Sequence, residues 1–245
     1  MAEVASGIRE VHRALIGPVL DGPAELRRYL GELEDDGLRG RMEELRAGFE
    51  RTVTGTTSRG DAYGFAPLKW EKCEALYALI RKRRPEVLVE TGVCNGVSTA
   101  VILLALERNG AGALHSVDLP EYTGIEYPRD AFWEGKKGAA VPRGKEPGWV
   151  IPAGLKERWE LLIGRSQDVL GGLLERLGRI DFFLHDSEHS YECMSFELRL
   201  ATAHLRPGGI LAADDTQWNS AFADFAEQRS LVPRSLGAGL AFAIV

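Results

Sequence analysis

The chain has 245 residues and a formal net charge of −6, from 30 Lys and Arg against 36 Asp and Glu. Hydrophobic residues make up 44% and charged residues 27%, which is ordinary for a globular protein whose core needs no disulfides. The acidic balance argues against nucleic acid as a partner, and no apolar run is long enough for a membrane span.

The cysteines and the N-terminal sequence favour a cytoplasmic location. Cys73, Cys94 and Cys193 are scattered, and none belongs to a CxxC pair. This pattern disfavours a disulfide framework or a zinc site. The first residues lack a basic segment followed by an apolar one, so we expect no secretory signal.

The N-terminal part has the hydrophobic spacing of helices. We predict helices over about 3–16, 23–33 and 38–51, with Pro23 at the first helical position of the second. This part is short for an independent domain. We therefore interpret residues 1–66 as a helical cap or an arm for assembly into a homodimer or higher homo-oligomer.

From residue 67 onward, predicted strands and helices alternate. The expected helices cover 68–83, 96–108, 167–177 and 190–204, and the expected strands cover 86–90, 113–117, 160–163, 180–184 and 210–213. The runs 230–234 and 241–245 are suited to a terminal antiparallel pair. Alternation at this spacing predicts an α/β fold over 67–245, a Rossmann-like, doubly wound and mostly parallel sheet.

A long insertion after the second predicted strand, residues 119–158, interrupts the alternation of strands and helices. It contains five Pro and shows no clean period. Loops of this length are commonly functional, and its aromatic residues argue against disorder. Two roles stay open for Trp133 and Trp149, which either cover a bound small molecule or anchor the loop to the core.

The run ETGVCNGVST, residues 90–99, lies between a predicted strand and a predicted helix. Gly92 and Gly96 would let a ligand approach the backbone, and the helix N-terminus would offer N–H groups to an anion. The spacing is neither GxGxxG nor that of a P-loop. Asp118 ends the second strand, where an acidic residue accepts hydrogen bonds from ribose hydroxyls. Its alternative role is that of a loop cap.

Two more polar clusters follow the fourth and fifth predicted strands. They are HDSEHSYE, residues 185–192, and the pair Asp214 and Asp215. Ligands bind at the carboxyl ends of parallel strands, so these side chains are expected to converge. Converging carboxylates repel, and Mg²⁺ would offset that repulsion. In the alternative interpretation Asp214 caps a helix and Glu188 is solvated.

These motifs resemble the class I S-adenosylmethionine-dependent methyltransferases over residues 87–216, slightly more than half of the chain. VLVETGVCNGVST resembles the first motif of that family and LHSVD the second. The run from IDFFLHDSEHSYE to LAADDT resembles one branch of the family. That branch includes macrolide and aminocoumarin sugar O-methyltransferases and cephalosporin hydroxylase-like proteins.

The resemblance implies roles for individual residues. The implied cofactor-binding residues are Glu90, Gly92, Gly96, Ser98 and Thr99 at the methionine end, Asp118 at the ribose, Ser166 and Gln167 at the adenine, and Asp186. The implied metal ligands are Asp186, Asp214 and Asp215. Relatives often have Asp-Gly-Asp-His-Ser-Tyr-Glu where this chain has DSEHSYE, and the second Asp is their proposed general base. The base is therefore open here between Glu188 and His189.

The expected activity is transfer of a methyl group from S-adenosylmethionine to a hydroxyl of a small molecule, with a natural-product sugar as one acceptor class. Such a displacement needs the acceptor held in line with the methyl group. Mg²⁺ would lower the pKa of the acceptor hydroxyl, and the base would take its proton. The alternatives are a cephalosporin hydroxylase-like or other metal-dependent enzyme on the same fold, or a non-catalytic cofactor-binding module.

Overall fold

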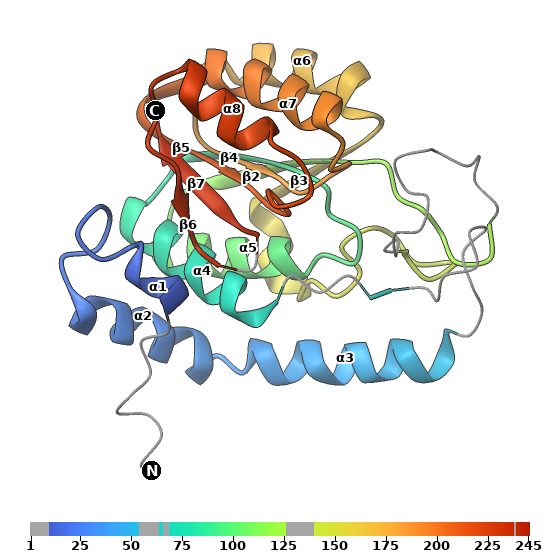
Figure 1. The fold of residues 1–245 in the computed structure, drawn as a ribbon. Coiled ribbons are helices and arrows are strands. Elements are labelled where there is room, and N and C mark those ends of the chain that lie inside the picture. The colour runs from blue at the N-terminus through green and yellow to red at the C-terminus, as the bar shows by residue number, and fades with distance from the viewer. Residues whose placement is uncertain (1–9, 54–63, 66–68, 126–139, 238) are drawn as a thin grey trace.

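A single sheet runs through the protein in a computed structural model that describes residues 10–53, 64–65, 69–125, 140–237 and 239–245 (Figure 1). The strands are β1 (Val87–Thr91), β2 (Ala113–Asp118), β3 (Trp159–Ile163), β4 (Ile180–His185), β5 (Leu205–Ala213), β6 (Arg234–Ser235) and β7 (Ala241–Ile244). Their order is β3-β2-β1-β4-β5-β7-β6. Strands β1 to β5 pair in parallel, whereas β7 is antiparallel to both β5 and β6. The predicted mostly parallel sheet with a terminal antiparallel pair is confirmed.

Helices cover both faces of this sheet (Figure 1). One face carries α4 (Trp70–Arg83) and α5 (Val97–Asn109), and the other carries α6 (Ser166–Leu177), α7 (Tyr191–His204) and α8 (Ala221–Gln228). Successive strand residues point to opposite faces. Accordingly Leu88 belongs to the core beside α4 and α5, and Val89 to the core beside α6 and α7. Within the described ranges, no helix is long and apolar enough to cross a membrane.

Of the three N-terminal helices, the first two lie against α4, and the third contacts the second (Figure 1). They are α1 (Glu10–Arg13), α2 (Pro23–Asp35) and α3 (Leu38–Thr52), and Pro23 opens α2 as predicted. Buried Leu26 and Leu33 of α2 join the same apolar core as α4 and α5. The proposed division of the chain at residue 66 falls outside the described residues and stays a prediction.

Some element boundaries differ from the sequence-based expectation. Of the helix predicted over 3–16, residues 3–9 lie outside the described residues, and the described part ends at Arg13. The chain turns there because Gly17 adopts a positive φ of 94° and donates its N–H to the carbonyl of Leu20. Pro18 follows and has no N–H with which to continue a helix.

Two predicted strands near the C-terminus, 210–213 and 230–234, also have different boundaries in the structure. β5 begins at Leu205, five residues before the strand predicted over 210–213, and a register shift in its pairing with β4 accommodates the extra residues. The run predicted at 230–234 forms a strand only at Arg234–Ser235. Pro233 stands directly before it and cannot donate to a ladder.

The described parts of the insertion pack against the sheet domain. Tyr122 and Val141 form an isolated bridge, and a 3-10 helix, η3 (Ala153–Arg158), contacts α5 and β3. Trp133 lies outside the described residues. The insertion therefore contains ordered structure that local periodicity did not reveal.

Candidate active site

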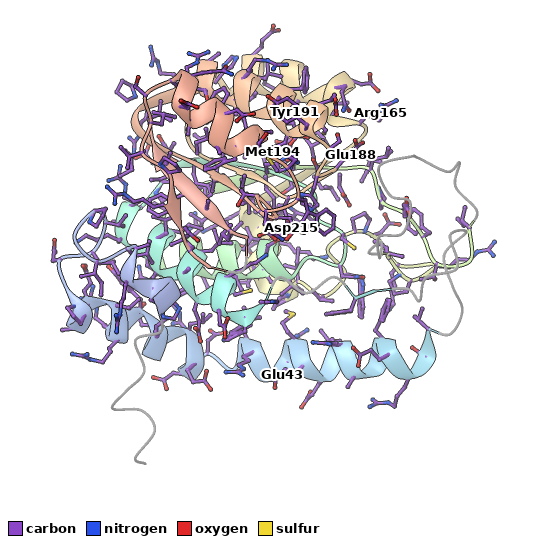
Figure 2. The ribbon with its side chains drawn as sticks, in the orientation of Figure 1. Glu43, Arg165, Glu188, Tyr191, Met194 and Asp215 are labelled. Atoms are coloured by element: carbon purple, nitrogen blue, oxygen red, sulfur yellow. The ribbon has the colours of Figure 1, made fainter. Side chains whose placement is uncertain are left out.

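The polar residues singled out in the sequence gather at one edge of the sheet. Because β1, β2, β4 and β5 are parallel, their carboxyl ends all open on the same edge. In Figure 2, Glu188 lies near Tyr191 and Arg165, at the starts of α7 and α6, and Asp215 lies lower, on the side of α4 and α5. The expected convergence of the three sequence clusters on this edge is found, and their contacts with one another are described below.

Glu90 is a fully buried carboxylate at the end of β1. It accepts hydrogen bonds from the hydroxyls of Ser98 at 2.8 Å, Thr99 at 2.9 Å and Ser116 at 3.0 Å. Burial raises the pKa of Glu90 to about 7, although the three hydroxyls oppose the shift. Glu90 thus ties the first turn of α5 to β1 and β2. The contacts predicted for Glu90, Ser98 and Thr99 with a methionine group stay predictions.

Replacing Glu90 with glutamine is expected to remove a pH dependence of stability. The folded pKa of about 7 lies above the ordinary 4.5, so the folded state holds an extra proton between these values. The wild type should therefore lose up to about 3 kcal/mol of stability relative to Glu90→Gln as the pH rises through this window. Urea unfolding at several pH values measures this difference. Parallel stability curves for the two proteins would contradict the assignment.

Gly92 and Gly96 permit close approaches between parts of the backbone. A Cβ on Gly92, whose φ is 87°, would lie 2.0 Å from the carbonyl oxygen of Asp186. A Cβ on Gly96, with φ 97°, would lie 2.6 Å from the Cα of Gly148 in the insertion. The structure therefore explains both glycines by packing, and their predicted contact with a ligand stays a prediction.

Asp118 organises the loop that follows β1. Its two carboxylate oxygens accept hydrogen bonds from the backbone N–H groups of Val93 at 3.3 Å and Cys94 at 3.2 Å. Burial raises the pKa of Asp118 to about 6, against the effect of these donors. The carboxylate is mostly ionised at neutral pH. The backbone N–H of Leu119 is a third donor, so about one of the four lone-pair sites of the carboxylate is left for another donor.

Asn95 joins the same loop to the insertion. Its Nδ2 donates to the carbonyls of Phe65 at 2.9 Å and Ala140 at 3.2 Å, and its Oδ1 accepts from the indole N–H of Trp149. Trp149 also packs edge-to-face against Phe65, with ring centroids 6.2 Å apart. Of the two roles left open for Trp149, the structure favours the anchor. Sequence analysis did not single out Asn95, and its amide within a glycine-rich loop was the available signal.

Two carboxylates that follow β5 pair with a lysine from α4. Lys72 Nζ lies 2.5 Å from Oδ1 of Asp214 and 3.5 Å from Oδ1 of Asp215. Burial raises the pKa of Asp214, while Lys72 acts in the opposite direction. Burial, reinforced by Asp214, raises the pKa of Asp186 well above its usual range. Sequence analysis missed Lys72, whose only signal was a lysine in the apolar face of a predicted helix.

His189 faces this carboxylate cluster. Its Nε2 lies 3.6 Å from Oδ2 of Asp215 and 4.0 Å from Oδ1 of Asp186. Burial and the neighbouring His185 lower the pKa of His189 to about 4, despite the opposing effect of Asp215. The imidazole is therefore neutral at pH 7, and a pKa this low makes it a weak base in this arrangement.

Glu188, the alternative base, makes a different contact. Its Oε1 accepts a hydrogen bond from the hydroxyl of Ser190 at 2.5 Å. Ser190 is the N-cap of α7 and also accepts from the backbone N–H of Cys193. The hydrogen bond from Ser190 thus links Glu188 to the start of α7.

A second buried network lies behind the site. Glu197 of α7 is fully buried and accepts from the hydroxyls of Thr91 at 2.6 Å and Ser187 at 2.8 Å. Its Oε2 also lies 2.6 Å from Nδ1 of His185. Burial alone would raise the pKa of Glu197, but His185 and the hydroxyls lower it overall. This network fixes the ends of β1 and β4, and the sequence did not identify Glu197.

Ser166 and Gln167 open α6 and meet the first turn of α7. The Nε2 of Gln167 lies 3.5 Å from the Sγ of Cys193, and the hydroxyl of Ser166 lies 3.8 Å from the same sulfur. They occupy the strand-end edge after β3, where the family resemblance puts the adenine. Their predicted contact with the cofactor stays a prediction.

Comparison with known proteins decides the family. A family model described as a methyltransferase domain matches residues 89–216, just over half of the chain. The chain belongs to this methyltransferase family. The matched span starts in β1 and ends just after Asp215, so it contains all the strand-end clusters. The suspected resemblance is thereby confirmed for the family and the fold.

Two solved structures share the fold of the methyltransferase. One, from Klebsiella pneumoniae, was solved as a candidate O-methyltransferase. It has 17% identity and a TM-score of 0.50, and the match covers 96% of each chain. The other is the O-methyltransferase TomG of Streptomyces achromogenes, involved in tomaymycin synthesis and solved with S-adenosylmethionine. It has 16% identity and a TM-score of 0.51, over 82% of this chain and 96% of that one. No curated protein sequence matches the chain.

Proposed function

We propose that the methyltransferase transfers a methyl group from S-adenosylmethionine to a hydroxyl of a small molecule. The observation that carries this proposal is the family match over 89–216, which coincides with the polar strand-end edge of the sheet. The fold shared with TomG, an O-methyltransferase in complex with S-adenosylmethionine, supports the same donor and a hydroxyl acceptor. A natural-product sugar as acceptor, a cytoplasmic location and a homodimer are finer parts of the proposal.

The described residues fit the proposed cofactor at its ribose. Asp118 is a largely buried carboxylate at the end of β2 that is mostly ionised at neutral pH, and with three backbone donors on about four lone-pair sites it can still accept from a further hydroxyl. Such a carboxylate suits a hydroxyl of the ribose. Nearby, α5 starts at Gly96 without a side-chain cap, which leaves the amide end of the helix suited to a carboxylate group.

In this proposal His189 takes the proton of the acceptor hydroxyl. The support for this role is that its Nε2 faces Asp186 and Asp215, and the role requires its pKa to rise from about 4 toward the working pH when the acceptor binds. Asp215 would stabilise the imidazolium that forms, at an Nε2 to Oδ2 distance of 3.6 Å. S-adenosylmethionine, when bound, supplies an electrophilic methyl group on a sulfonium. The chain's remaining task is to hold the acceptor oxygen in line with that methyl group and exclude water.

The predicted Mg²⁺ site at Asp186, Asp214 and Asp215 does not fit the arrangement of these side chains. The Lys72 ammonium lies 2.5 Å from Asp214, where a cation bound to that carboxylate would stand. Among the described residues, no group of three or more His, Cys, Asp or Glu is arranged to hold a metal ion. We therefore assign no step of the reaction to Mg²⁺.

Isothermal titration calorimetry with S-adenosylmethionine and S-adenosylhomocysteine tests the proposed function. We expect both to bind in the micromolar range, after which glycosylated and other hydroxylated small molecules are screened as acceptors. Folded protein that binds neither compound would contradict the proposal. Oxygen consumption with a bound acceptor would instead support the hydroxylase alternative. Binding without turnover of any acceptor would favour a cofactor-binding module.

Replacing Asp118 with asparagine is expected to weaken S-adenosylmethionine binding. The amide keeps the size of the side chain but loses the charge and one acceptor oxygen. We expect a loss of about 1–3 kcal/mol of binding free energy, as for a buried hydrogen-bond partner. Calorimetry measures the change, and a thermal melt confirms folding. Asp168→Asn, at an exposed aspartate of α6, serves as the control. Unchanged affinity in Asp118→Asn would exclude the ribose role.

A further inference from the structure

Lys72 occupies an unusual place for a lysine. It lies in the first turn of α4, and only 4% of its surface is exposed. Lysine is almost never fully buried unless its charge is paired. Its neighbours in α4, Cys73 and Leu76, are fully buried apolar residues. The side chain of Lys72 therefore lies in the core, and its ammonium group reaches Asp214 at the strand-end edge.

The partners of Lys72 are the residues that the family resemblance implies as metal ligands. The ammonium lies 2.5 Å from Oδ1 of Asp214 and 3.5 Å from Oδ1 of Asp215. Asp215 has a positive φ of 50°, which is uncommon for a residue other than glycine. In this conformation its Oδ1 faces Lys72 and also accepts a hydrogen bond from Nε2 of Gln217 at 3.1 Å, and its Oδ2 faces Nε2 of His189 at 3.6 Å. Asp215 thereby connects the buried cation to the proposed base.

We propose that the Lys72 ammonium is the resident cation of this active site and stands in place of a divalent metal ion. The part of the inference that concerns catalysis, namely the effect of Lys72 on methyl transfer, rests on the proposed function. The charge arrangement itself rests on Lys72, Asp214 and Asp215. Lys72 is a positioning residue that holds Asp215 toward His189, and methyl transfer is independent of added Mg²⁺.

The charge balance explains why a metal ion and Lys72 exclude one another. Mg²⁺ needs oxygen ligands at about 2.0–2.1 Å in a near-octahedral set. Lys72 Nζ already lies 2.5 Å from one of the required oxygens, so both cations cannot occupy this position. Displacing the ammonium would leave an unpaired positive charge in the core, which is strongly unfavourable. Removing the charge from Lys72 would leave the carboxylates uncompensated and raise their attraction for a divalent ion.

The decisive experiment titrates Mn²⁺, as the probe ion, into the wild type and into Lys72→Met, followed by electron paramagnetic resonance of free Mn²⁺. We expect Lys72→Met to bind Mn²⁺ at least about tenfold more tightly than the wild type, because methionine has a similar length and no charge. We also expect its kcat to fall at least about tenfold while its KM for S-adenosylmethionine changes little. Wild-type kcat should be unchanged in excess chelator.

The control is Lys69→Met, which removes an exposed lysine three residues earlier in the same segment. It should keep the wild-type Mn²⁺ affinity and activity. Lys72→Gln is a second neutral variant in case Lys72→Met does not fold. Wild-type Mn²⁺ binding that is lost in Asp214→Asn would overturn the inference without any lysine variant. A folded neutral variant that binds Mn²⁺ no better than the wild type would overturn it as well.

The two proposals fail in different measurements. S-adenosylmethionine calorimetry on the same samples tests the proposed function and does not depend on Mn²⁺. Absence of cofactor binding, with the expected gain of Mn²⁺ affinity in Lys72→Met, would reject the methyl donor and retain the charge arrangement. Cofactor binding together with tight Mn²⁺ binding by the wild type would retain the function and reject the role of Lys72.

Discussion

Replacing Gly92 with alanine is expected to destabilise the folded methyltransferase by about 2–5 kcal/mol. Two effects add at this position. The φ of 87° is strained for a residue with a Cβ, and that Cβ would lie 2.0 Å from the carbonyl oxygen of Asp186. The obstacle is backbone at the end of β4, which also donates the Asp186 N–H to Thr91. Relief therefore requires the ends of β1 and β4 to separate.

Gly110→Ala is the matched control for Gly92→Ala. Gly110 also has a positive φ, 71°, at the C-terminal end of α5, but a Cβ there would meet nothing within 4 Å. Its cost should be limited to the backbone strain, about 1–2 kcal/mol. Urea unfolding of both variants measures the difference. Equal losses of unfolding free energy in the two variants would show that the clash of the new Cβ with the Asp186 carbonyl contributes nothing.

Replacing Glu197 with alanine is expected to destabilise the protein by about 3–5 kcal/mol, because several polar groups would lose the buried carboxylate that they share. Glu197 is fully buried and receives bonds from Thr91 and Ser187 as well as its contact with His185. The substitution would leave the buried Thr91 and His185 and the part-buried Ser187 without this acceptor. Chemical unfolding measures the loss.

The control for Glu197→Ala is Glu192→Ala, at an exposed glutamate of the same helix. It should cost less than about 1 kcal/mol, from the helix dipole alone. Because the folded pKa of Glu197 is lowered, its stabilising contribution is present above the unfolded pKa and is lost as the pH falls through the folded value. The difference in free energy of unfolding between the wild type and Glu197→Ala should therefore become smaller as the pH is lowered. A gap that widens in acid would exclude an ionised Glu197 in the folded protein.

The sequence by itself determined the order and type of the main elements. The runs at 86–90, 113–117 and 180–184 are apolar, short and closed by polar residues, and each is a strand of the parallel sheet. Parallel strands put their carboxyl ends on one edge. For that reason the motifs that follow these strands could be assigned to one region of the protein from local pattern alone.

Tertiary structure decided which side chains meet at that edge. Lys72 reaches Asp214 across 142 positions of sequence, and Glu197 reaches Thr91 across 106. Both residues lie in helices, where a charged residue has no local pattern that separates a buried partner from a solvated one. The roles of Gly92 and Asn95 likewise depend on approaches by Asp186, Phe65 and Ala140. Local preferences act over a few residues, whereas burial and charge pairing arise only when distant segments are brought together.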